Sequence, residues 1–287
     1  MQELIQYQVP IRLGIFLLLF ALLSWWEACY FWRPWLEVRI QRWGRHFGMN
    51  LISKVILLLL FPTLTLGVAV HAQQKKMGVL NYDLPFIQHD AIKIVLAILA
   101  IDLFMYIQHR LMHRYRFLWR FHRVHHTDRE LDASTGLRFH PLEEIYTMGI
   151  KMLAVMFLGA LPIAVFIYEV WYNFTTLYMH LNVKFKFRID RRLRKIFVTP
   201  GMHRIHHSDN PLEYNSNFSF IFSVWDKLFD SYRHEALASE RKMVIGLEEF
   251  KNPYYANNLV NLHLIPFNLK RLKPRAQKHL PTKMKGL

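Results

Sequence analysis

The chain alternates long apolar runs with short segments that are rich in arginine and histidine. A membrane-spanning helix needs about twenty mainly apolar residues, and three runs come close to that length: residues 11–31, 51–70 and 91–107. Pro62 lies midway along the second run, where neighbouring helices can cover the carbonyl group that a proline leaves unpaired. The pattern therefore predicts three spans in series, and we expect the first to be uncleaved because no small-residue cleavage site follows it.

A fourth apolar stretch covers residues 146–179 and carries almost no charge. Gly159-Ala160-Leu161-Pro162 interrupts it, and the stretch is shorter than the roughly forty residues that two full spans need. We therefore expect a helical hairpin of two short or tilted helices, which returns the chain to its starting side at His180. The predicted fold class is an all-α integral membrane helical bundle with about three spans and a helical hairpin.

The chain is strongly basic, with 37 Lys and Arg residues against 21 Asp and Glu residues and a formal net charge of +16. Such a charge first suggests nucleic acid, but the long apolar runs favour a membrane protein, so we expect no nucleic-acid partner. Basic residues collect at the cytoplasmic surface of a membrane. The arginine-rich connector, residues 33–49, and the histidine-rich region are therefore assigned to the cytoplasmic side of a bacterial inner membrane or the endoplasmic reticulum. Residues 71–90 are assigned to the other side.

These runs divide the sequence into three units. Residues 1–90 are an N-terminal membrane-spanning region with two spans, residues 91–235 carry every box of histidines, and residues 236–287 are a basic cytoplasmic C-terminal tail. The end of the tail holds Lys and Arg residues without an acid, which suits contact with anionic lipid. The single cysteine, Cys29, lies in an apolar stretch and is expected to be a small buried residue.

Eight histidines stand in three short boxes. The first box is the pair His109 and His113, spaced i, i+4, and the other two are i, i+3, i+4 triplets that begin at His122 and His203. Residues at these spacings share one face of a helix, so we expect each box to direct its imidazoles to one point of a cytoplasmic histidine-box cap. The box histidines are His109, His113, His122, His125, His126, His203, His206 and His207.

Converging imidazoles indicate a metal site. Neutral imidazole is a common ligand of iron, zinc and copper, and eight rings exceed the three or four protein ligands of a single zinc ion. A lone histidine on an apolar helix is more often an ordinary core residue. Three boxes of matching geometry, however, need a partner for their buried ring nitrogens, and we therefore expect two metal ions.

Other polar residues near the boxes are further candidates. His180 ends the hairpin where the boxes are expected, so it is counted as a ninth ligand. Asp102 lies seven residues before His109 and is expected either to accept a hydrogen bond from a ligand ring or to pair with an arginine at the membrane surface. Whether His140 is a ligand stays open. The remaining histidines are interpreted as ordinary surface residues: His46, His71, His89, His234, His263 and His279.

The type of ligand does not decide the metal, because nitrogen-rich sites suit iron, zinc and copper alike. The expected location gives a further indication. A metal pair where apolar helices meet the cytoplasmic interface faces a lipid tail. Attack on an unactivated C–H bond needs an oxidant made from O2, which protein side chains cannot supply. Iron, with two ions per chain, is therefore favoured.

The boxes and the residues around them resemble the fatty acid hydroxylase/sterol desaturase superfamily over roughly residues 95–232. Two departures from the family pattern are Asp230-Ser231, where Gly-Thr is common, and His180, which stands alone where some branches have a second histidine. The similar motifs are His109-x3-His113, Leu118-Trp119-Arg120-Phe121-His122-x2-His125-His126, His140-Pro141-Leu142-Glu143, His180-Leu181-Asn182, Thr199-Pro200-Gly201-Met202-His203-x2-His206-His207, Tyr214-Asn215-x-Asn217 and Trp225-Asp226-Lys227-Leu228-Phe229.

The resemblance implies an integral membrane non-haem di-iron enzyme. Such an enzyme uses O2 and two electrons to hydroxylate or desaturate a lipid, for example a fatty acyl chain or a sterol-like ring. The resemblance also implies the ligand role for the eight box histidines and for His180. We expect a separate electron donor of the ferredoxin or cytochrome type, because no electron-carrying domain is recognised in the sequence.

Two other functions remain open on the sequence. A di-zinc membrane hydrolase would use the same imidazoles and would keep its activity without O2. A non-enzymatic membrane protein that binds haem or a metal ion between the imidazoles would show a visible absorption band if the group were haem. The sequence indicates neither the lipid nor the carbon that would be oxidised.

Overall fold

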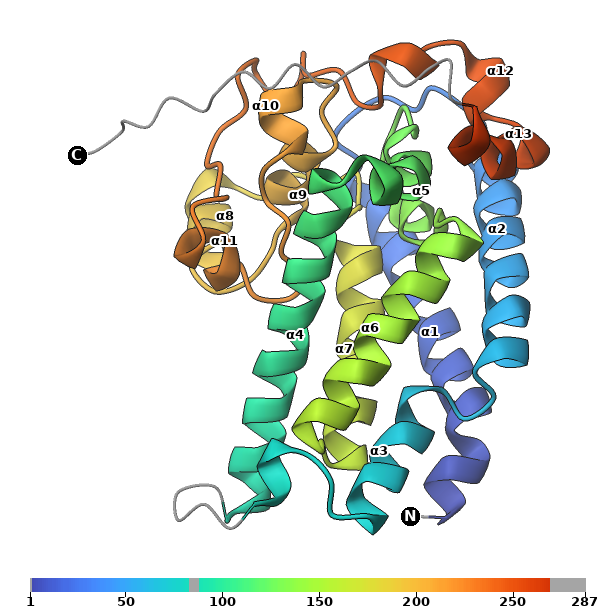
Figure 1. The fold of residues 1–287 in the computed structure, drawn as a ribbon. Coiled ribbons are helices and arrows are strands. Elements are labelled where there is room, and N and C mark those ends of the chain that lie inside the picture. The colour runs from blue at the N-terminus through green and yellow to red at the C-terminus, as the bar shows by residue number, and fades with distance from the viewer. Residues whose placement is uncertain (1, 83–87, 269–287) are drawn as a thin grey trace.

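The computed structural model describes residues 2–82 and 88–268, and within these ranges the chain forms helices and turns without a strand. The predicted all-α class is confirmed. Long helices run side by side and form the body of the molecule (Figure 1). They are α1 (Gln2–Tyr30), α2 (Arg39–Leu60), α3 (Leu64–Gln74), α4 (Asp90–Arg114), α6 (Pro141–Leu158) and α7 (Pro162–Tyr178).

Three predicted elements are found as helices at the expected places, while the number of membrane spans stays a prediction. The first predicted span overlaps α1, which begins earlier, at Gln2, and the third lies within α4, which continues without a break through the first histidine box. α6 and α7 form the predicted hairpin. Pro162 takes the first position of α7, where the missing N–H would have no partner in any case. Cys29 is exposed on α1, so the prediction that it is a small buried residue is wrong.

The second predicted span is broken. α2 begins at Arg39, well before the predicted start at residue 51, and ends at Leu60, while α3 begins only at Leu64. Pro62 lies in this break because its nitrogen cannot donate the next helical hydrogen bond and its ring clashes with the preceding turn. Leu64 has a positive φ of 51°, so the chain changes direction before α3. The prediction that one helix continues through the proline is therefore wrong.

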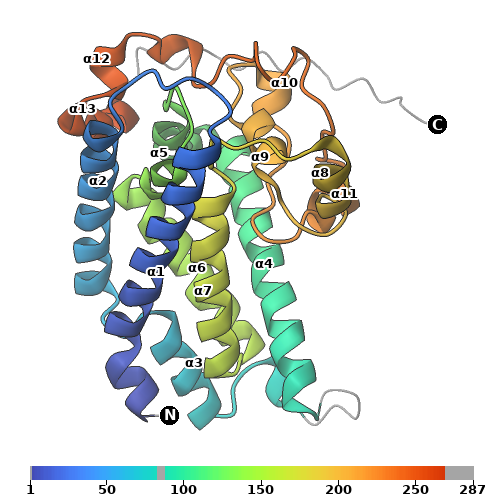
Figure 2. The same cartoon turned by 180° about the vertical axis from the view of Figure 1, so that it is seen from behind.

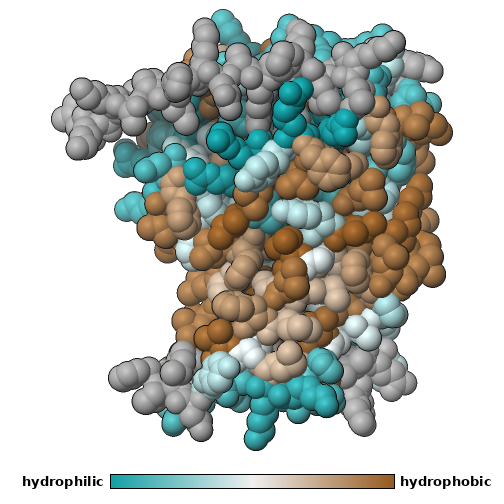
Figure 3. Space-filling view, in the orientation of Figure 1, coloured by the Kyte–Doolittle hydropathy of each residue, from teal (hydrophilic) through white to brown (hydrophobic). Residues whose placement is uncertain are grey.

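On the face seen in Figure 3, an apolar belt lies between two polar ends of the bundle. Two stretches, Tyr7–Tyr30 and Arg39–Asn81, are long and apolar enough to cross a membrane, and only 17% and 33% of their apolar windows are buried. Soluble proteins rarely expose a continuous apolar surface of this size, so the belt indicates a lipid-facing surface. Exposed side chains of the belt include Leu18 on α1, Leu59 on α2, Val95 on α4 and Leu153 on α6.

The N-terminus and the histidine boxes lie at opposite ends of the bundle (Figures 1 and 2). From the N-terminal end, α1, α4 and α7 run towards the boxes, and α2 and α6 run back. α4 packs against both helices of the hairpin, and α1 packs against α7. The helix order therefore brings all box-bearing segments to one end, which we call the box end.

Two glycines lie in close contact at the opposite end of the bundle. Gly159 ends α6 in the left-handed conformation with a φ of 63°, and Gly78 precedes η1 (Val79–Asn81) with a φ of 92°. A Cβ atom on Gly159 would lie 2.0 Å from the carbonyl oxygen of Met77, and one on Gly78 would lie 2.1 Å from the nitrogen of Gly159. Only glycine allows both this conformation and this approach.

Residues 236–268 fold over the box end (Figure 1). Arg123 of α5 (Arg116–His126) donates a hydrogen bond to the carbonyl of Ile265, and the two segments share a buried apolar core with Met49 of α2. Residues 269–287, which include the expected basic tail end, lie outside the described residues, and the unit boundaries at residues 90 and 235 stay predictions. The short helices here are η3 (Glu248–Phe250), α12 (Pro253–Ala256), α13 (Leu259–Leu264) and η4 (Ile265–Phe267).

Candidate metal centre

Four segments bring the histidines together at the box end. The first box lies at the end of α4 and the second at the end of α5. The third occupies α9 (Pro200–His206) and the residue after it, and His180 follows α7. Thr199 caps α9 because its hydroxyl oxygen accepts a hydrogen bond from the nitrogen of Met202. All nine side chains are at most 2% exposed, so bulk water does not satisfy their nitrogens.

The nine predicted histidines form two groups that adjoin each other. Within each group, one ring nitrogen per residue lies within 4.8 Å of those of the other members. The two groups touch where the rings of His126 and His207 stack with their centroids 4.5 Å apart. The first histidine group contains His109, His113, His122, His126 and His206, and the second histidine group contains His125, His180, His203 and His207.

Each triplet box is divided between the two groups, so the prediction that a box directs all its imidazoles to one point is wrong for the second and third boxes. Successive residues of an α-helix differ by about 100° around its axis, so two adjacent histidines point in different directions. The boxes on α5 and α9 therefore each contribute rings to both groups. The second box gives His122 and His126 to the first group and His125 to the second, and the third box gives His206 to the first and His203 and His207 to the second.

The second histidine group is held together by ring nitrogens that face one another. His180 Nδ1 donates a hydrogen bond to the carbonyl of Thr176 at 2.6 Å, so Nε2 carries the lone pair. That Nε2 atom lies 3.0 Å, 3.1 Å and 3.2 Å from Nε2 of His203, His125 and His207. The single lone pair of His180 Nε2 cannot accept hydrogen bonds from three neighbouring nitrogens at once. Two nitrogens on one metal at about 2.1 Å are roughly 3.0–3.4 Å apart, which matches this spacing.

The first histidine group shows the same arrangement. His109 Nδ1 donates to the carbonyl of Phe218 at 2.7 Å, and His122 Nδ1 lies 2.6 Å from Oε1 of Glu143. The Nε2 atom of His109 therefore carries a lone pair, and it lies only 3.0 Å from Nε2 of His122. His126 Nε2 lies 3.2 Å from the same His122 nitrogen. This close approach of three ring nitrogens suits a shared cation.

His206 gives a direct test of whether the residues fit a metal ion. Its Nδ1 donates to the carbonyl of Ser216 at 2.7 Å, so its Nε2 has the lone pair. This buried Nε2 has no hydrogen-bond partner among the described residues, which costs about 1–3 kcal/mol if nothing binds it. A metal ion would remove that cost, and an all-imidazole donor set fits iron, zinc and copper. The residues present therefore fit two metal ions.

Burial keeps the rings neutral, as metal ligands must be. Burial lowers the pKa of His122 to about 3 and that of His180 to about 4. Burial and then the nearby imidazoles lower the pKa values of His125, His203 and His207 well below the ordinary histidine value. Neutral rings leave one nitrogen of each available as a ligand at physiological pH.

Asp102 has neither of the contacts expected for it. Its carboxylate accepts hydrogen bonds from Trp225 Nε1 at 2.8 Å and from the backbone nitrogens of Phe222 and Ile221 at 3.1 Å and 3.3 Å. A few residues earlier, the same segment supplies the Phe218 carbonyl that accepts from His109. Asp102 therefore contacts none of the described histidine rings itself. It holds the segment around residues 218–225, whose Phe218 carbonyl orients the ring of His109.

The histidines outside the two groups have varied surroundings. His140 caps α6, where its Nδ1 accepts from the nitrogen of Leu142 at 3.2 Å, and its Nε2 lies 3.3 Å from the carbonyl of His263. His46 is fully buried and its Nδ1 lies 2.8 Å from Ser134 Oγ, so its interpretation as a surface residue is wrong. His263 is half-buried, His71, His89 and His234 are exposed as predicted, and His279 lies outside the described residues.

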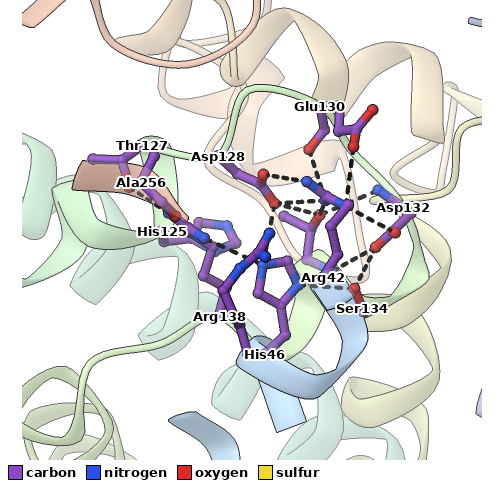
Figure 4. Close-up of polar contacts among 12 residues, drawn as sticks. Arg42, His46, His125, Thr127, Asp128, Glu130, Asp132, Ser134, Arg138 and Ala256 are labelled. Atoms are coloured by element: carbon purple, nitrogen blue, oxygen red, sulfur yellow. Dashed lines mark hydrogen bonds and ion pairs between the residues drawn. The ribbon is translucent and has the colours of Figure 1, made fainter. Parts of the chain in front are cut away.

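A buried arginine–carboxylate network lies beside the second histidine group and consists of Arg42, Asp128, Glu130 and Asp132 (Figure 4). The two terminal nitrogens of Arg42 bind the two oxygens of Asp128 at 2.8 Å and 3.0 Å, and its Nε lies 3.2 Å from Asp132. Burial alone would raise the pKa of Asp128, but the positive charges of Arg42 and Arg138 hold it below its ordinary value. The network joins α2 to the loop that follows the second box.

Arg138 connects the same loop to the end of α5. Its Nε donates to the carbonyl of Val124 at 3.1 Å, and its terminal nitrogen donates to Thr127 Oγ1 at 2.7 Å and to the carbonyl of Ala256 at 3.0 Å. Val124 and Thr127 flank His125 and His126 in the sequence. Arg138 therefore holds the backbone that carries two rings, one from each histidine group.

Two cavities lead to the site. A crevice of about 20 Å³ is lined by His109 and His122 of the first group, by His125 and His203 of the second, and by other side chains that include Gln108. A larger groove of about 210 Å³ is mainly apolar and lies between the end of α4, α5 and the start of α6. Glu143 lines both cavities. We call them the crevice and the groove.

Sequence reasoning missed Gln108, Glu143 and Arg138 as residues of the site. Glu143 was noted only as part of a motif, although an acid in the first turn of a helix that follows a histidine box is a signal for a carboxylate–imidazole pair. Asp128, Glu130 and Asp132 alternate just after the second box, and this acidic run signals a buried cation partner. No sequence signal marks Gln108.

The fold and the site together define a class: an all-helical protein with a lipid-facing belt and two buried histidine groups that fit metal ions. Residues 94–231 match the family model described as "Fatty acid hydroxylase". Just under half of the chain thus matches this family, and the resemblance seen in the sequence motifs is confirmed.

Curated relatives include lipid-oxidising enzymes. The chain is 31% identical over 148 residues to ornithine lipid hydroxylase OlsE of Rhizobium tropici, a match that covers 50% of this chain and 43% of that protein. It is 30% identical over 158 residues to alkylglycerol monooxygenase of Homo sapiens, covering 53% of this chain and 32% of that protein. The matched region therefore spans less than half the length of each of these relatives. No solved structure matches the chain.

Proposed function

We propose that this chain is an O2-dependent membrane lipid hydroxylase that holds two iron ions, one in each histidine group. The observation that supports this most directly is the convergence of ring nitrogens at 3.0–3.2 Å within both groups, which suits a shared cation. A mainly apolar groove adjoins the site, which suits a lipid chain. Hydroxylation is favoured over desaturation because one of these relatives is named a hydroxylase and the other a monooxygenase.

The proposed reaction replaces a lipid C–H bond with C–OH. The lipid, O2, two electrons and two protons give the hydroxylated lipid and one water molecule. Iron, when bound, supplies the reduction of O2 that makes attack on such a bond possible. The protein keeps the rings in the ligand tautomer through backbone carbonyls, which accept hydrogen bonds from His109, His180 and His206. The buried surroundings keep bulk water away from the reacting carbon.

We also propose that the box end faces the cytoplasm of a bacterial inner membrane or the cytoplasmic side of the endoplasmic reticulum. A separate electron donor of the ferredoxin or cytochrome type would deliver the two electrons there. Arg110, Arg114 and Arg116 are exposed at the box end. Their positive charge supports docking of a donor with an acidic surface, because complementary charge speeds encounter between proteins.

Metal analysis tests the iron proposal. We expect purified protein to contain about two metal ions per chain, and iron after anaerobic reconstitution. Protein made in excess is expected to take up zinc as well, because imidazole sites bind zinc more tightly than ferrous iron. Elemental analysis that finds no more than one metal ion per chain after iron reconstitution would contradict the two-ion site.

The two alternative functions give different results in the same preparation. A di-zinc hydrolase would act equally well without O2, whereas the hydroxylase needs O2 and a reductant. A haem carrier would show a visible haem absorption band in place of non-haem iron. Oxygen-dependent formation of a hydroxylated lipid in membranes, followed by mass spectrometry, is the result expected here.

A further inference from the structure

The crevice in front of the histidines is lined by two side chains that each have an oxygen without a partner in the described part of the chain. Glu143 Oε2 and Gln108 Oε1 are buried and have no hydrogen-bond partner among the described residues. The two side chains are only 4% and 2% exposed. Both are acceptors, and a buried acceptor without a donor costs about 1–3 kcal/mol. Such groups in a binding cavity indicate that a ligand supplies the missing hydrogen.

The other oxygen of Glu143 is already used. Oε1 lies 2.6 Å from Nδ1 of His122 and orients that ring, which leaves Oε2 as the free acceptor. The second carboxylate of the crevice, Glu144, is paired with Lys54 at 2.7 Å. Within the described residues, the crevice oxygens that lack a hydrogen-bond donor are therefore those of Gln108 and Glu143.

The sizes of the two cavities indicate which part of a lipid molecule each cavity can hold. The crevice has about 20 Å³ of free volume, which is close to the space that one water molecule needs. It takes a small polar group such as a hydroxyl or an amide N–H and excludes a hydrocarbon chain. The groove has about 210 Å³ and a mainly apolar lining that includes Phe117, Phe121 and Tyr146. A hydrocarbon chain therefore fits the groove and not the crevice.

We propose that Gln108 and Glu143 select the substrate and its reacting carbon by accepting a hydrogen bond from a hydroxyl or amide N–H of the lipid. This inference rests on the proposed function. The crevice is lined by rings of both histidine groups, so a donor held there brings the carbons next to it closest to the metals. The substrate is thus a lipid that is oxidised within a few bonds of its polar group, and not in the middle or at the far end of its chain.

The test compares pairs of lipids that differ only in the donor. One pair is a long-chain alcohol and its methyl ether, and the other is a long-chain secondary amide and its N-methyl derivative. Binding to purified protein in lipid nanodiscs is measured by competition with a fluorescent long-chain probe. Wild-type protein is expected to bind one donor-bearing member about 10–100-fold more tightly than its partner. The pair that shows the preference tells whether a hydroxyl or an amide is recognised.

Two substitutions examine the two acceptors separately. Gln108→Met keeps the length of the side chain but removes its hydrogen-bond acceptor. The ratio of the two affinities within a lipid pair should therefore fall towards one. In Glu143→Gln the amide oxygen stays with His122 Nδ1, so the amide NH2 group faces the crevice and should favour the methyl ether. The matched control is Gln41→Met, because Gln41 is exposed on α2; its preference should equal that of the wild type.

The outcomes distinguish this inference from the proposed function. Equal binding of both members of each pair by the wild type, or an unchanged preference in both variants, would overturn the inference even if lipids are oxidised. Product analysis adds a second criterion, because oxidation far from the polar group would also overturn it. A donor preference that depends on Gln108 and Glu143, in protein that oxidises no lipid, would support the inference and refute the proposed hydroxylase.

Discussion

The histidine rings at this site depend on one another, because their converging ring nitrogens suit a shared metal ion. In the proposed site the removal of one ring leaves its metal undercoordinated and leaves the facing nitrogens in repulsion. Carbonyl partners keep several rings in the required tautomer, so each ring is also tied to the backbone around it. Ligands that act as a unit lose their function together, and their losses are not additive.

Single histidine substitutions should therefore abolish activity in both groups. We expect His113→Ala and His206→Ala in the first group, and His125→Ala and His180→Ala in the second, to remove lipid oxidation while the protein still inserts in the membrane. His71→Ala is the matched control, because His71 is exposed on α3, the helix at the other end of the bundle (Figure 1). The assay is oxygen-dependent product formation in membranes with a reductase system. Substantial turnover by two or more of the four variants would refute a shared site.

At the scale of elements, the site depends on helices that are held in place from outside the boxes. α5 and α9 are short, and each serves both histidine groups, so a small rotation of either helix would misplace rings on both sides. The arginine–carboxylate network restrains the loop after α5 by joining it to α2 (Figure 4). α2 contributes no ring, yet it positions the second box.

Loss of the central arginine of this network should destabilise the protein. Arg42→Met leaves Asp128 and Asp132 as buried charges with too little compensation, which typically costs about 3–5 kcal/mol. We expect a clear fall in the thermal unfolding temperature in detergent, together with a lower metal content. Arg188→Met is the control, because Arg188 is exposed on α8 (Phe187–Leu193). Equal unfolding temperatures for the two variants would show that the network contributes little.

At the scale of the whole molecule, the arginines that guided the predicted orientation are used inside the protein. Arg39 pairs with Glu27 at 2.7 Å, Arg45 pairs with Glu37, and Arg42 is fully buried. They are therefore weaker evidence for a cytoplasmic loop than their number in the sequence suggests. The exposed arginines around the boxes are the remaining support for this orientation.

Accessibility of single cysteines tests the orientation directly. A Cys29→Ser background removes the exposed native thiol. Lys75→Cys directly follows α3, the helix at the end opposite the boxes, and Arg116→Cys begins α5, which carries the second box; both positions are exposed. We expect an impermeant thiol reagent to label Lys75→Cys from outside intact cells and to label Arg116→Cys only after the membrane is opened. Labelling in the reverse pattern would place the box end outside.

The sequence by itself determined the features that depend on local spacing. The apolar runs identified α1, α4 and the hairpin, because the length of an apolar run and the residues that interrupt it are local properties. The i, i+3 and i+4 spacings identified eight of the nine histidines that come together, and the end of the predicted hairpin identified His180. The break at Pro62 was visible as a proline, but its effect depended on whether neighbouring helices would cover the freed carbonyl.

Only the tertiary structure decided how these residues are combined. The division of each triplet between two histidine groups depends on where α5 and α9 lie relative to α4 and α7. The burial of His46 and Arg42 depends on partners some ninety residues away in the sequence, and spacing within one helix carries no information about such contacts. Gln108 and Glu143 became candidates for substrate recognition only because α4 and α6, together with α5, α7 and α9, line one crevice. A cavity is a property of packed helices and not of a sequence.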